Sequence, residues 1–450
     1  MSSIHDTLAH LHKSSPAQDE FFQAASKTLE RLQPLLDREP RYHQHSIIER
    51  IVEPERQIFF RVCWTDDADK VRVNKGYRVQ FSSALGPYKG GLRFHPSVNA
   101  GIIKFLGFEQ IFKNALTGLP IGGAKGGSDF DPKGKSDAEI MRFCQSFMNE
   151  LYRHIGPTTD VPAGDIGVGT REIGYLFGQY KRLTGRYDGV LTGKGLGWGG
   201  SLGRKEATGY GTVYFAQHML HARGEDIAGK TCLISGAGNV AIYTIEKLYQ
   251  LGARPITCSD SLGTIHHAAG INLDTVKLLK EGKRASLHEY LAHHPDATYI
   301  ARADYPADGH AVWRFKADAA FPSATQNEVT AADARALVAN GVTCLAEGSN
   351  MGSTGDAIEV LLASKVAYGP GKAANAGGVA TSQLEMAQNS SMQQWTTEQV
   401  DRKLREIMSS IYRRCTQAAE EFGQPHDLVL GANIAGFRRV ADAMIAQGVY

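Results

Sequence analysis

Two lysines stand in glycine-rich strings of a kind that could support proton transfer. Lys89 lies in GPYKGGLRF and Lys125 in GLPIGGAKGGSD, and the glycines predict a turn around each lysine. Small neighbours let backbone and a ligand pack closely around the side chain. Burial or nearby cations would then lower the lysine pKa towards neutrality, so that the amine could act in acid–base or polarising chemistry. The alternative for each residue is an ordinary exposed turn lysine.

A third cation, Lys113, lies between these strings on a helix predicted over residues 101–115. Three lysines in so short a stretch indicate an anionic small-molecule substrate, and a lysine phosphate site is the competing interpretation. Asp165, between Gly164 and Gly167, adds a carboxylate that could shuttle protons beside a lysine ammonium. Its alternative role is an Asx turn that holds its own backbone.

A dinucleotide-binding pattern occurs in the second half of the chain, where residues 236–241 read GAGNVA. The string follows a predicted strand at 231–235 and precedes a predicted helix at 240–251. Gly236 would make the tight turn, and Gly238 would let the backbone approach a pyrophosphate at the helix N-terminus. This strand–turn–helix context favours a dinucleotide site over a bland βα turn.

The choice between NAD and NADP depends on the end of the next predicted strand, at 255–259. Asp260 follows it, and an acid there generally pairs with the ribose 2′-hydroxyl of NAD. The flanking hydroxyls, Ser261 among them, could instead bind the 2′-phosphate of NADP. The general rule leaves both cofactors open.

Hydrophobic periodicity predicts the elements that must position these residues. Ser136 followed by Glu139 predicts a capped start for a helix over 137–153. The other predicted helices cover 18–37, 171–183, 207–224, 330–339, 397–422 and 433–446, and the other predicted strands cover 57–63, 69–81, 318–321 and 342–346.

A change of composition near residue 200 predicts two domains of α/β class with a cleft between them. Residues 1–200 form the predicted substrate-binding and oligomerisation domain, onto which a C-terminal helix over 425–450 packs back. Residues 201–424 form a predicted Rossmann-type dinucleotide-binding domain.

Composition excludes several classes of protein. The chain has 450 residues with a net charge of +2, and no basic block indicates nucleic acid. The N-terminus lacks a secretory apolar region, and no apolar run is long enough for a transmembrane helix, so a cytoplasmic enzyme is expected. Six scattered cysteines without a CxxC pair indicate reduced thiols. The histidine pairs lack spaced partner ligands, so no metal site is predicted and surface positions are expected.

Five longer strings resemble the small hexameric glutamate dehydrogenases, of NADP type, in the Glu/Leu/Phe/Val dehydrogenase family. They are GYRVQFSSALGPYKGGLRFHPSVN, LPIGGAKGGSDFDPKGKSD, DVPAGDIGVGTREIGYLFGQY, GGSLGRKEATGYGTVYF and NAGGVATSQLEMAQNS. The resemblance covers nearly the whole chain. It implies reversible oxidation of L-glutamate to 2-oxoglutarate and ammonium through an iminium, in a homohexamer.

The resemblance also implies roles for individual residues. Lys125 would be the catalytic lysine and Asp165 the proton carrier. Lys89 and Ser382 would bind the substrate γ-carboxylate. The implied α-carboxylate and pocket residues are Gln110, Lys113, Gly164 and Val379, and the implied cofactor-binding residues are Thr208, Gly236, Gly238, Asn239, Val240, Asp260, Ser261 and Asn375, the last of which also lines the substrate pocket.

The string SDSLGT resembles NADP-dependent members, so NADP is expected in preference to NAD, with Ser261 nearest the 2′-phosphate. A leucine, phenylalanine or valine dehydrogenase is the first alternative, and Lys89 together with Ser382 argues against it. A non-catalytic subunit that keeps the fold is the second, and the intact lysines and GAGNVA argue against it. Lys205, where many relatives carry proline, and the glycine-rich run 185–203 have no assigned role.

Overall fold

The computed structural model describes residues 4–14 and 18–449, and they divide into two compact units. The first unit contains the described residues up to Arg204, the segment Val379–Val400 and the residues from Asn433 onward. The second contains Lys205–Gly378 and Asp401–Ala432. These bounds differ from the predicted 1–200 and 201–424 chiefly because Val379–Val400 packs in the first unit.

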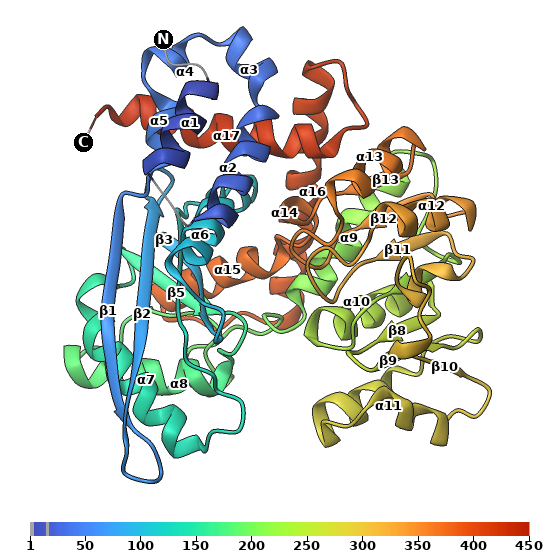
Figure 1. Ribbon diagram of the computed structural model, residues 1–450, viewed down its shortest axis with the longest axis horizontal. Helices are drawn as coiled ribbons and strands as arrows, with labels where there is room; N and C mark the ends of the chain where they lie inside the picture. The colour runs from blue at the N-terminus through green and yellow to red at the C-terminus, as the bar shows by residue number, and fades with distance from the viewer. Residues whose placement is uncertain (1–3, 15–17, 450) are drawn as a thin grey trace. The chain divides into compact units, whose positions relative to one another are not determined.

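The first unit is built on a five-stranded mixed sheet in the order β1-β2-β4-β3-β5. β1 and β2 form the long antiparallel hairpin in Figure 1, and β2 also pairs antiparallel with β4. β3 lies between β4 and β5 and is parallel to both. The bounds are β1 Arg56–Thr65, β2 Val71–Ser82, β3 Tyr88–Phe94, β4 Gly123–Ser128 and β5 Asp160–Gly164.

Helices cover both faces of this sheet. α7 and α8 share a buried cluster with one face, in which Phe94 packs against Phe143 and Phe147. α6 and α2 pack against the other face, where the ring centroid of Phe108 lies 5.8 Å from the ring centroids of both Phe21 and Phe81. The helices are α1 Ile4–Ser14, α2 Asp19–Glu30, α3 Gln33–Arg38, α4 Arg41–Gln44, α5 Ile47–Ile51, α6 Ala100–Leu116, α7 Asp137–Leu151 and α8 Thr170–Thr184.

Local sequence signals determine where some of these helices begin. The capping box predicted for α7 is present, since Ser136 Oγ accepts from Glu139 N and Ser136 N donates to Glu139 Oε2. The single helix predicted over 18–37 is wrong, because two helices, α2 and α3, cover it. Pro34 stands near the start of α3, where its missing N–H is tolerated, and it cannot sit in a helix interior.

The turns predicted around the two lysines are also wrong. Lys89 lies inside β3 and Lys125 inside β4. Glycine is needed there because neighbouring backbone comes very close: a Cβ on Gly90 would stand 1.7 Å from the Ala124 carbonyl oxygen. The glycines mark close strand packing and not chain reversal.

The second unit contains a five-stranded parallel sheet in the order β13-β12-β11-β6-β7 and a smaller antiparallel sheet β10-β9-β8. β6 is the first strand and has later strands on both sides, so the strand order reverses beside it. The bounds are β6 Thr231–Ile234, β7 Arg254–Pro255, β8 Thr257–Ser259, β9 Gly263–His266, β10 Thr298–Ala301, β11 Ala319–Phe321, β12 Cys344–Ala346 and β13 Ala367–Gly369.

The helices of this unit, labelled in Figure 1, include α9 and α10, which pack together where Gly209 meets the α10 backbone. They are α9 Ala207–His221, α10 Asn239–Gln250, α11 Leu273–Lys277, α12 Ala331–Ala339, α13 Gly355–Ala363 and α14 Gly371–Ala374, with a π-helical turn η3 at Leu278–Lys283. Three further helices span the junctions between units: α15 Gly377–Ser391, α16 Thr397–Glu421 and α17 Leu428–Gln447.

Two further observations bear on the sequence predictions. His267, expected at the surface, is buried, and its ring nitrogens lie 3.0 Å from Tyr290 Oη and Asp296 Oδ2. Within the described residues, none of the helices combines the length and apolar character needed to cross a membrane.

Candidate active site

The pleat of the first sheet gathers the predicted catalytic side chains on one face. Val79 of β2 lies opposite Lys125, and a Cβ on Gly107 of α6 would meet Lys125 Cβ at 3.7 Å, so the Lys125 side chain leaves β4 on the face that α6 covers. Strand alternation then places every second residue of β3 on one face. A Cβ on Gly91 would meet Lys125 Nζ at 3.4 Å, which identifies that face as the one shared with Lys89 and Arg93.

Lys125, Asp165 and Arg93 form a tight charged cluster on this face. Lys125 Nζ lies 3.1 Å from Asp165 Oδ2, and Arg93 Nε donates to the same oxygen over 2.8 Å. Asp165 follows β5 in a turn in which Val168 N donates to the Asp165 carbonyl. The predicted pairing of a lysine with this aspartate is therefore present in the structure.

Burial and neighbouring charges shift the pKa values of this cluster. Burial would raise the pKa of Asp165, but Lys125 and Arg93 more than offset it and hold the pKa below its ordinary value. Burial lowers the pKa of Lys125, with Arg93 acting in the same direction and Asp165 against it. A larger fraction of the Lys125 amine is thus neutral near physiological pH than for an exposed lysine.

Gly91 makes room for the cluster. A Cβ at this position would lie 2.9 Å from Asp165 Cβ and 2.9 Å from the Gly164 carbonyl oxygen. Neither group is the flexible end of a long side chain, so any larger residue would displace the aspartate. The glycine that follows Lys89 in the sequence by two residues therefore leaves the space that the Asp165 side chain occupies.

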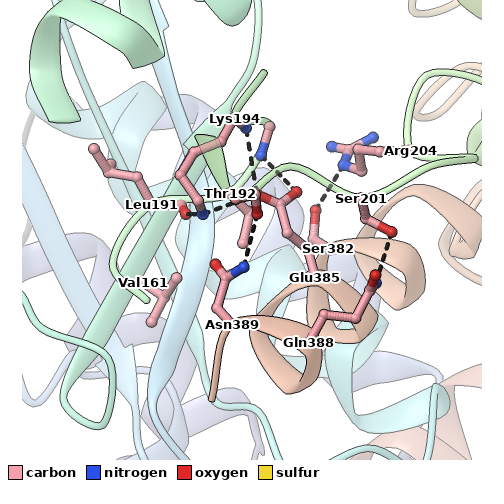
Figure 2. Close-up of polar contacts among 12 residues, drawn as sticks. Val161, Leu191, Thr192, Lys194, Ser201, Arg204, Ser382, Glu385, Gln388 and Asn389 are labelled. Carbon is pink, nitrogen blue, oxygen red and sulfur yellow. Dashed lines mark hydrogen bonds and ion pairs between the residues drawn. The ribbon is translucent and has the colours of Figure 1, made fainter. Parts of the chain in front are cut away.

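Lys89 is fully buried, and its Nζ donates to the Val161 carbonyl over 2.9 Å and to Thr192 Oγ1 over 2.7 Å. Burial lowers its pKa well below the ordinary value, and Arg204 adds to the shift. Arg204 Nε donates to Ser382 Oγ over 2.9 Å (Figure 2). Two basic groups, Lys89 and Arg204, and a hydroxyl thus stand where an additional carboxylate would be stabilised and would favour the charged form of Lys89.

Gln110 and Lys113 lie one turn apart on α6. Burial, with the charge of Lys125 as the next cause, lowers the pKa of Lys113 to about 8. Gln110 Nε2 donates to Asn114 Oδ1, and Asn114 Nδ2 donates to the Lys89 carbonyl. Gly164 ends β5 beside Asp165, and Val379 lies half-buried on α15, one turn before Ser382.

In the second unit, the GAGNVA string forms the turn between β6 and α10. Gly236 has a φ of +83°, which favours glycine, and a Cβ there would meet the Ser323 carbonyl oxygen at 2.8 Å. Gly238 is the N-cap of α10, and no described heavy atom lies within 4 Å of where its Cβ would stand. An open glycine at a helix N-terminus beside the reversal of strand order fits a pyrophosphate.

The neighbouring predicted residues are placed around that turn. Asn239 Nδ2 donates to the Lys205 carbonyl over 2.6 Å, so Lys205 adjoins the turn. Thr208 is half-exposed in the first turn of α9. Val240 lies in the first turn of α10, 2.9 Å from where a Cβ on Gly348 would stand.

Asp260 is fully engaged within the protein. Its Oδ1 accepts from the Leu262 and Gly263 amides, and its Oδ2 accepts from Lys280 Nζ and the Leu287 amide, both over 3.0 Å. The negative charge of the carboxylate is therefore balanced by Lys280 and the backbone amides. The same hydrogen bonds shape the loop that carries the exposed Ser261. This arrangement removes the free acid that the general NAD rule requires.

Two buried polar atoms at the carboxyl ends of the parallel strands have no hydrogen-bond partner among the described residues, Asn375 Oδ1 and Glu328 Oε2. Asn375 Nδ2 donates to the Ser349 carbonyl, and Glu328 Oε1 accepts from Ser349 Oγ. Burial raises the pKa of Glu328 to about 7. Unpaired buried polar atoms fit a site completed by a ligand.

The comparisons with known proteins agree with this geometry. Residues 199–448 match the family described as Glutamate/Leucine/Phenylalanine/Valine dehydrogenase, and residues 54–182 match the Glu/Leu/Phe/Val dehydrogenase, dimerisation domain. The chain belongs to the Glu/Leu/Phe/Val dehydrogenase family. The predicted family and the predicted two-domain α/β fold are therefore confirmed.

Among its relatives in this dehydrogenase family, the NADP-specific glutamate dehydrogenase of Helicobacter pylori is 61% identical over 446 residues, covering 99% of this chain and 100% of that protein. The NADP-specific glutamate dehydrogenase of Escherichia coli is 53% identical, covering 99% of each chain. A crystal structure of Plasmodium falciparum glutamate dehydrogenase matches with a TM-score of 0.96 at 52% identity, covering 99% of this chain and 95% of that chain.

Three residues that contact the predicted site residues were missed from the sequence: Arg93, Thr192 and Arg204. Arg93 could have been found from its spacing, because residues 89, 91 and 93 share one face once β3 is known to be a strand. Thr192 and Arg204 reach the site only through the path of the glycine-rich run, for which the sequence offered no local signal.

Proposed function

We propose that this chain is an NADP-dependent glutamate dehydrogenase, which interconverts L-glutamate with 2-oxoglutarate and ammonium. The observation that carries the proposal is the Lys125–Asp165–Arg93 cluster, whose lysine is buried, on the same sheet face as the buried Lys89. The names of the close relatives, NADP-specific glutamate dehydrogenases, support it.

The cations divide between the two ends of a dicarboxylate substrate. Lys89 and Ser382, with Arg204, bind the γ-carboxylate, and Lys113 and Gln110 with the Gly164 backbone bind the α-carboxylate. Lys113, with a pKa of about 8, is charged at neutral pH and so suits this task. The pocket residue Val379 contributes apolar surface between them.

Proton movement falls to Lys125 and Asp165. Because the pKa of Lys125 is lowered, its neutral amine can take a proton from the water that attacks the substrate iminium. Asp165, held ionised by two cations, accepts a proton from the substrate nitrogen and returns it in the reverse direction.

NADP fits the residues of the second unit. Gly236, Gly238, Val240 and the α10 N-terminus would hold the pyrophosphate, with Asn239, Thr208 and Asn375 around it, and Ser261 would bind the 2′-phosphate. The carboxylate of Asp260 is occupied by Lys280 and backbone amides, which supports NADP over NAD. The bound cofactor supplies the hydride chemistry. A homohexamer and a cytoplasmic location complete the proposal, and size-exclusion chromatography with light scattering tests the assembly.

Initial rates with 2-oxoglutarate, ammonium and either NADPH or NADH test substrate, reaction and cofactor together. We expect turnover that is faster with NADPH. Faster oxidation of leucine than of glutamate would refute the substrate assignment. A Lys125→Ala variant should lose turnover while keeping its circular dichroism spectrum, and activity like that of the unaltered enzyme would refute the role of Lys125.

A further inference from the structure

The glycine-rich run from Gly185 to Gly203 packs against α15 (Figure 2). Asn389 Nδ2 donates to the Gly199 carbonyl, and Gln388 Nε2 donates to Ser201 Oγ, each over 2.7 Å. A Cβ on Gly189 would stand 3.0 Å from Asn389 Cβ. The run that the sequence left without a role therefore seats the helix that carries Ser382.

A buried ion pair lies at the centre of this contact. Lys194 Nζ stands 2.9 Å from Glu385 Oε1, and the two side chains are 1% and 0% exposed. The Gly193 amide donates to Glu385 Oε2 over 2.9 Å, and Lys194 Nζ also donates to the Leu191 carbonyl. Leu191 has a φ of +63°, a strained conformation for leucine, so these contacts hold the loop 191–194 in an otherwise unfavourable shape.

Stability alone does not account for such a pair. The free-energy cost of desolvating two charges largely cancels the free energy of their attraction. Well-packed apolar residues would therefore stabilise this contact to a similar extent. What the pair adds is a fixed geometry, because each partner is also hydrogen-bonded to the backbone of the loop, Lys194 to the Leu191 carbonyl and Glu385 to the Gly193 amide.

The ion pair is connected to both predicted γ-carboxylate ligands, Lys89 and Ser382. Thr192, within the loop that Glu385 holds, is unexposed, and its Oγ1 accepts from Lys89 Nζ over 2.7 Å. Ser382 lies three residues before Glu385 and so on the same side of α15. Glu385 thus touches the support of Lys89 on one side and carries Ser382 on its own helix.

The charged side chains near Glu385 also support a role for this residue beside Lys89. Three basic side chains, Lys89, Lys194 and Arg204, interact electrostatically with one carboxylate, Glu385. Burial is the main reason that the pKa of Lys89 is lowered, and Glu385 opposes the shift whereas Arg204 and Lys194 increase it. Glu385 therefore favours the charged form of Lys89 and partly offsets the shift, and a second carboxylate placed beside Lys89 and Arg204 would favour that form further.

We propose that the Lys194–Glu385 ion pair positions Lys89 and Ser382 at a fixed separation and thereby sets the selectivity for a substrate with a side-chain carboxylate. The identity of that substrate rests on the proposed function. Lys194 and Glu385 are positioning residues, since they act through Thr192 and through α15.

The test compares two 2-oxo acids of equal chain length, 2-oxoglutarate and 2-oxopentanoate, with NADPH and ammonium. In Glu385→Gln, we expect kcat/KM for 2-oxoglutarate to fall about tenfold or more, mainly through KM. The value for 2-oxopentanoate, which lacks the side-chain carboxylate, should change less than twofold. An equal loss with both substrates would overturn the proposal, because a merely structural role damages both alike.

Gln388→Met is the matched control. Gln388 lies on the same helix, is equally buried and binds the same glycine-rich run through Ser201, and its side-chain hydrogen bonds among the described residues go to Ser201, Leu384 and Trp395 and not to the loop 191–194. Its substitution should leave the ratio of the two kcat/KM values unchanged. A loss of selectivity in this variant equal to that of Glu385→Gln would also overturn the proposal.

Two further variants cover a failure of Glu385→Gln to fold. Lys194→Met removes the other partner, and Thr192→Val removes only the hydroxyl that accepts from Lys89 while leaving the ion pair intact. Each should lower the selectivity ratio about tenfold, and an unchanged ratio in Thr192→Val would contradict the relay. The unaltered enzyme separates the two hypotheses: without turnover of 2-oxoglutarate the proposed function fails, irrespective of the ion pair.

Discussion

Arg93 donates from Nε to Asp165 Oδ2 over 2.8 Å, and the two residues lie next to each other on the same face, at the ends of the parallel strands β3 and β5. Lys125 approaches the same oxygen at 3.1 Å. Burial would favour the neutral acid, but the two cations together hold the pKa of Asp165 below its ordinary value. The cluster therefore holds an ionised carboxylate that can accept a proton.

Replacing Arg93 by methionine should raise the pKa of Asp165, since one of its two cations is lost, and also that of Lys125, whose pKa Arg93 lowers. Both limbs of the pH profile of kcat/KM for 2-oxoglutarate should move to higher pH, by about one unit. Initial rates between pH 5 and 10 measure the shift. A profile that falls in height without moving would show that Arg93 does not tune these groups.

Gly91→Ala should lower kcat about 100-fold, because the added Cβ would lie 2.9 Å from Asp165 Cβ and displace the carboxylate by a fraction of an ångström or more. Gly178→Ala is the control: this glycine lies on α8, and no described heavy atom stands within 4 Å of its Cβ position. The control should keep full activity. Equal activity of both variants would contradict the packing argument.

Glu328 makes the stability of the protein depend on pH. Its pKa is raised from 4.5 to about 7 by burial, so its neutral form stabilises the fold below pH 4.5 and this contribution is lost as the pH rises through 7. The loss amounts to at most about 3 kcal/mol. Relative to the unaltered protein, Glu328→Gln should therefore gain thermal stability between pH 5 and 8. Melting temperatures of both proteins, measured from pH 5 to pH 8, test this. If the difference between the two melting temperatures stays constant over that range, Glu328 does not titrate there and the prediction is wrong.

Ser261→Ala should weaken NADPH binding about tenfold and leave NADH binding unchanged, because a hydrogen bond to a charged phosphate is worth about 1.5 kcal/mol or more. Quenching of NADPH fluorescence gives the dissociation constants without turnover. Similar losses for both cofactors would place the 2′-phosphate elsewhere.

The sequence was most informative where a function depends on neighbours along the chain. The turn at Gly236–Gly238 and the capped start of α7 are local, and both could be predicted. Around Lys89 and Lys125 the same glycines were misread as turns, because glycine is rare in strands unless another backbone lies against it. That neighbour, the Ala124 carbonyl beside Gly90, is 34 residues away and invisible to any local pattern.

Long-range contacts decided the rest of the site. Asp260 suggested NAD by its position, but its partners Lys280 and Leu287 come 20 and 27 residues later and remove it from use. Lys194 and Glu385 lie 191 residues apart, and each on its own resembles a surface residue of its type. Only the assembled fold shows that they are buried together.

The path of the chain has a consequence for synthesis. Residues up to Arg204 contain Lys89, Lys125 and Asp165, but Ser382 and Glu385 return to this unit only with α15, after the whole of Lys205–Gly378. A growing chain therefore emerges from the ribosome with Lys194 and Lys89 made long before the carboxylate that accompanies them. The proposed substrate site is completed late in translation, so a chain released before α15 holds Lys125, the proposed catalytic lysine, but lacks Ser382 and Glu385, to which we assign a part in substrate recognition.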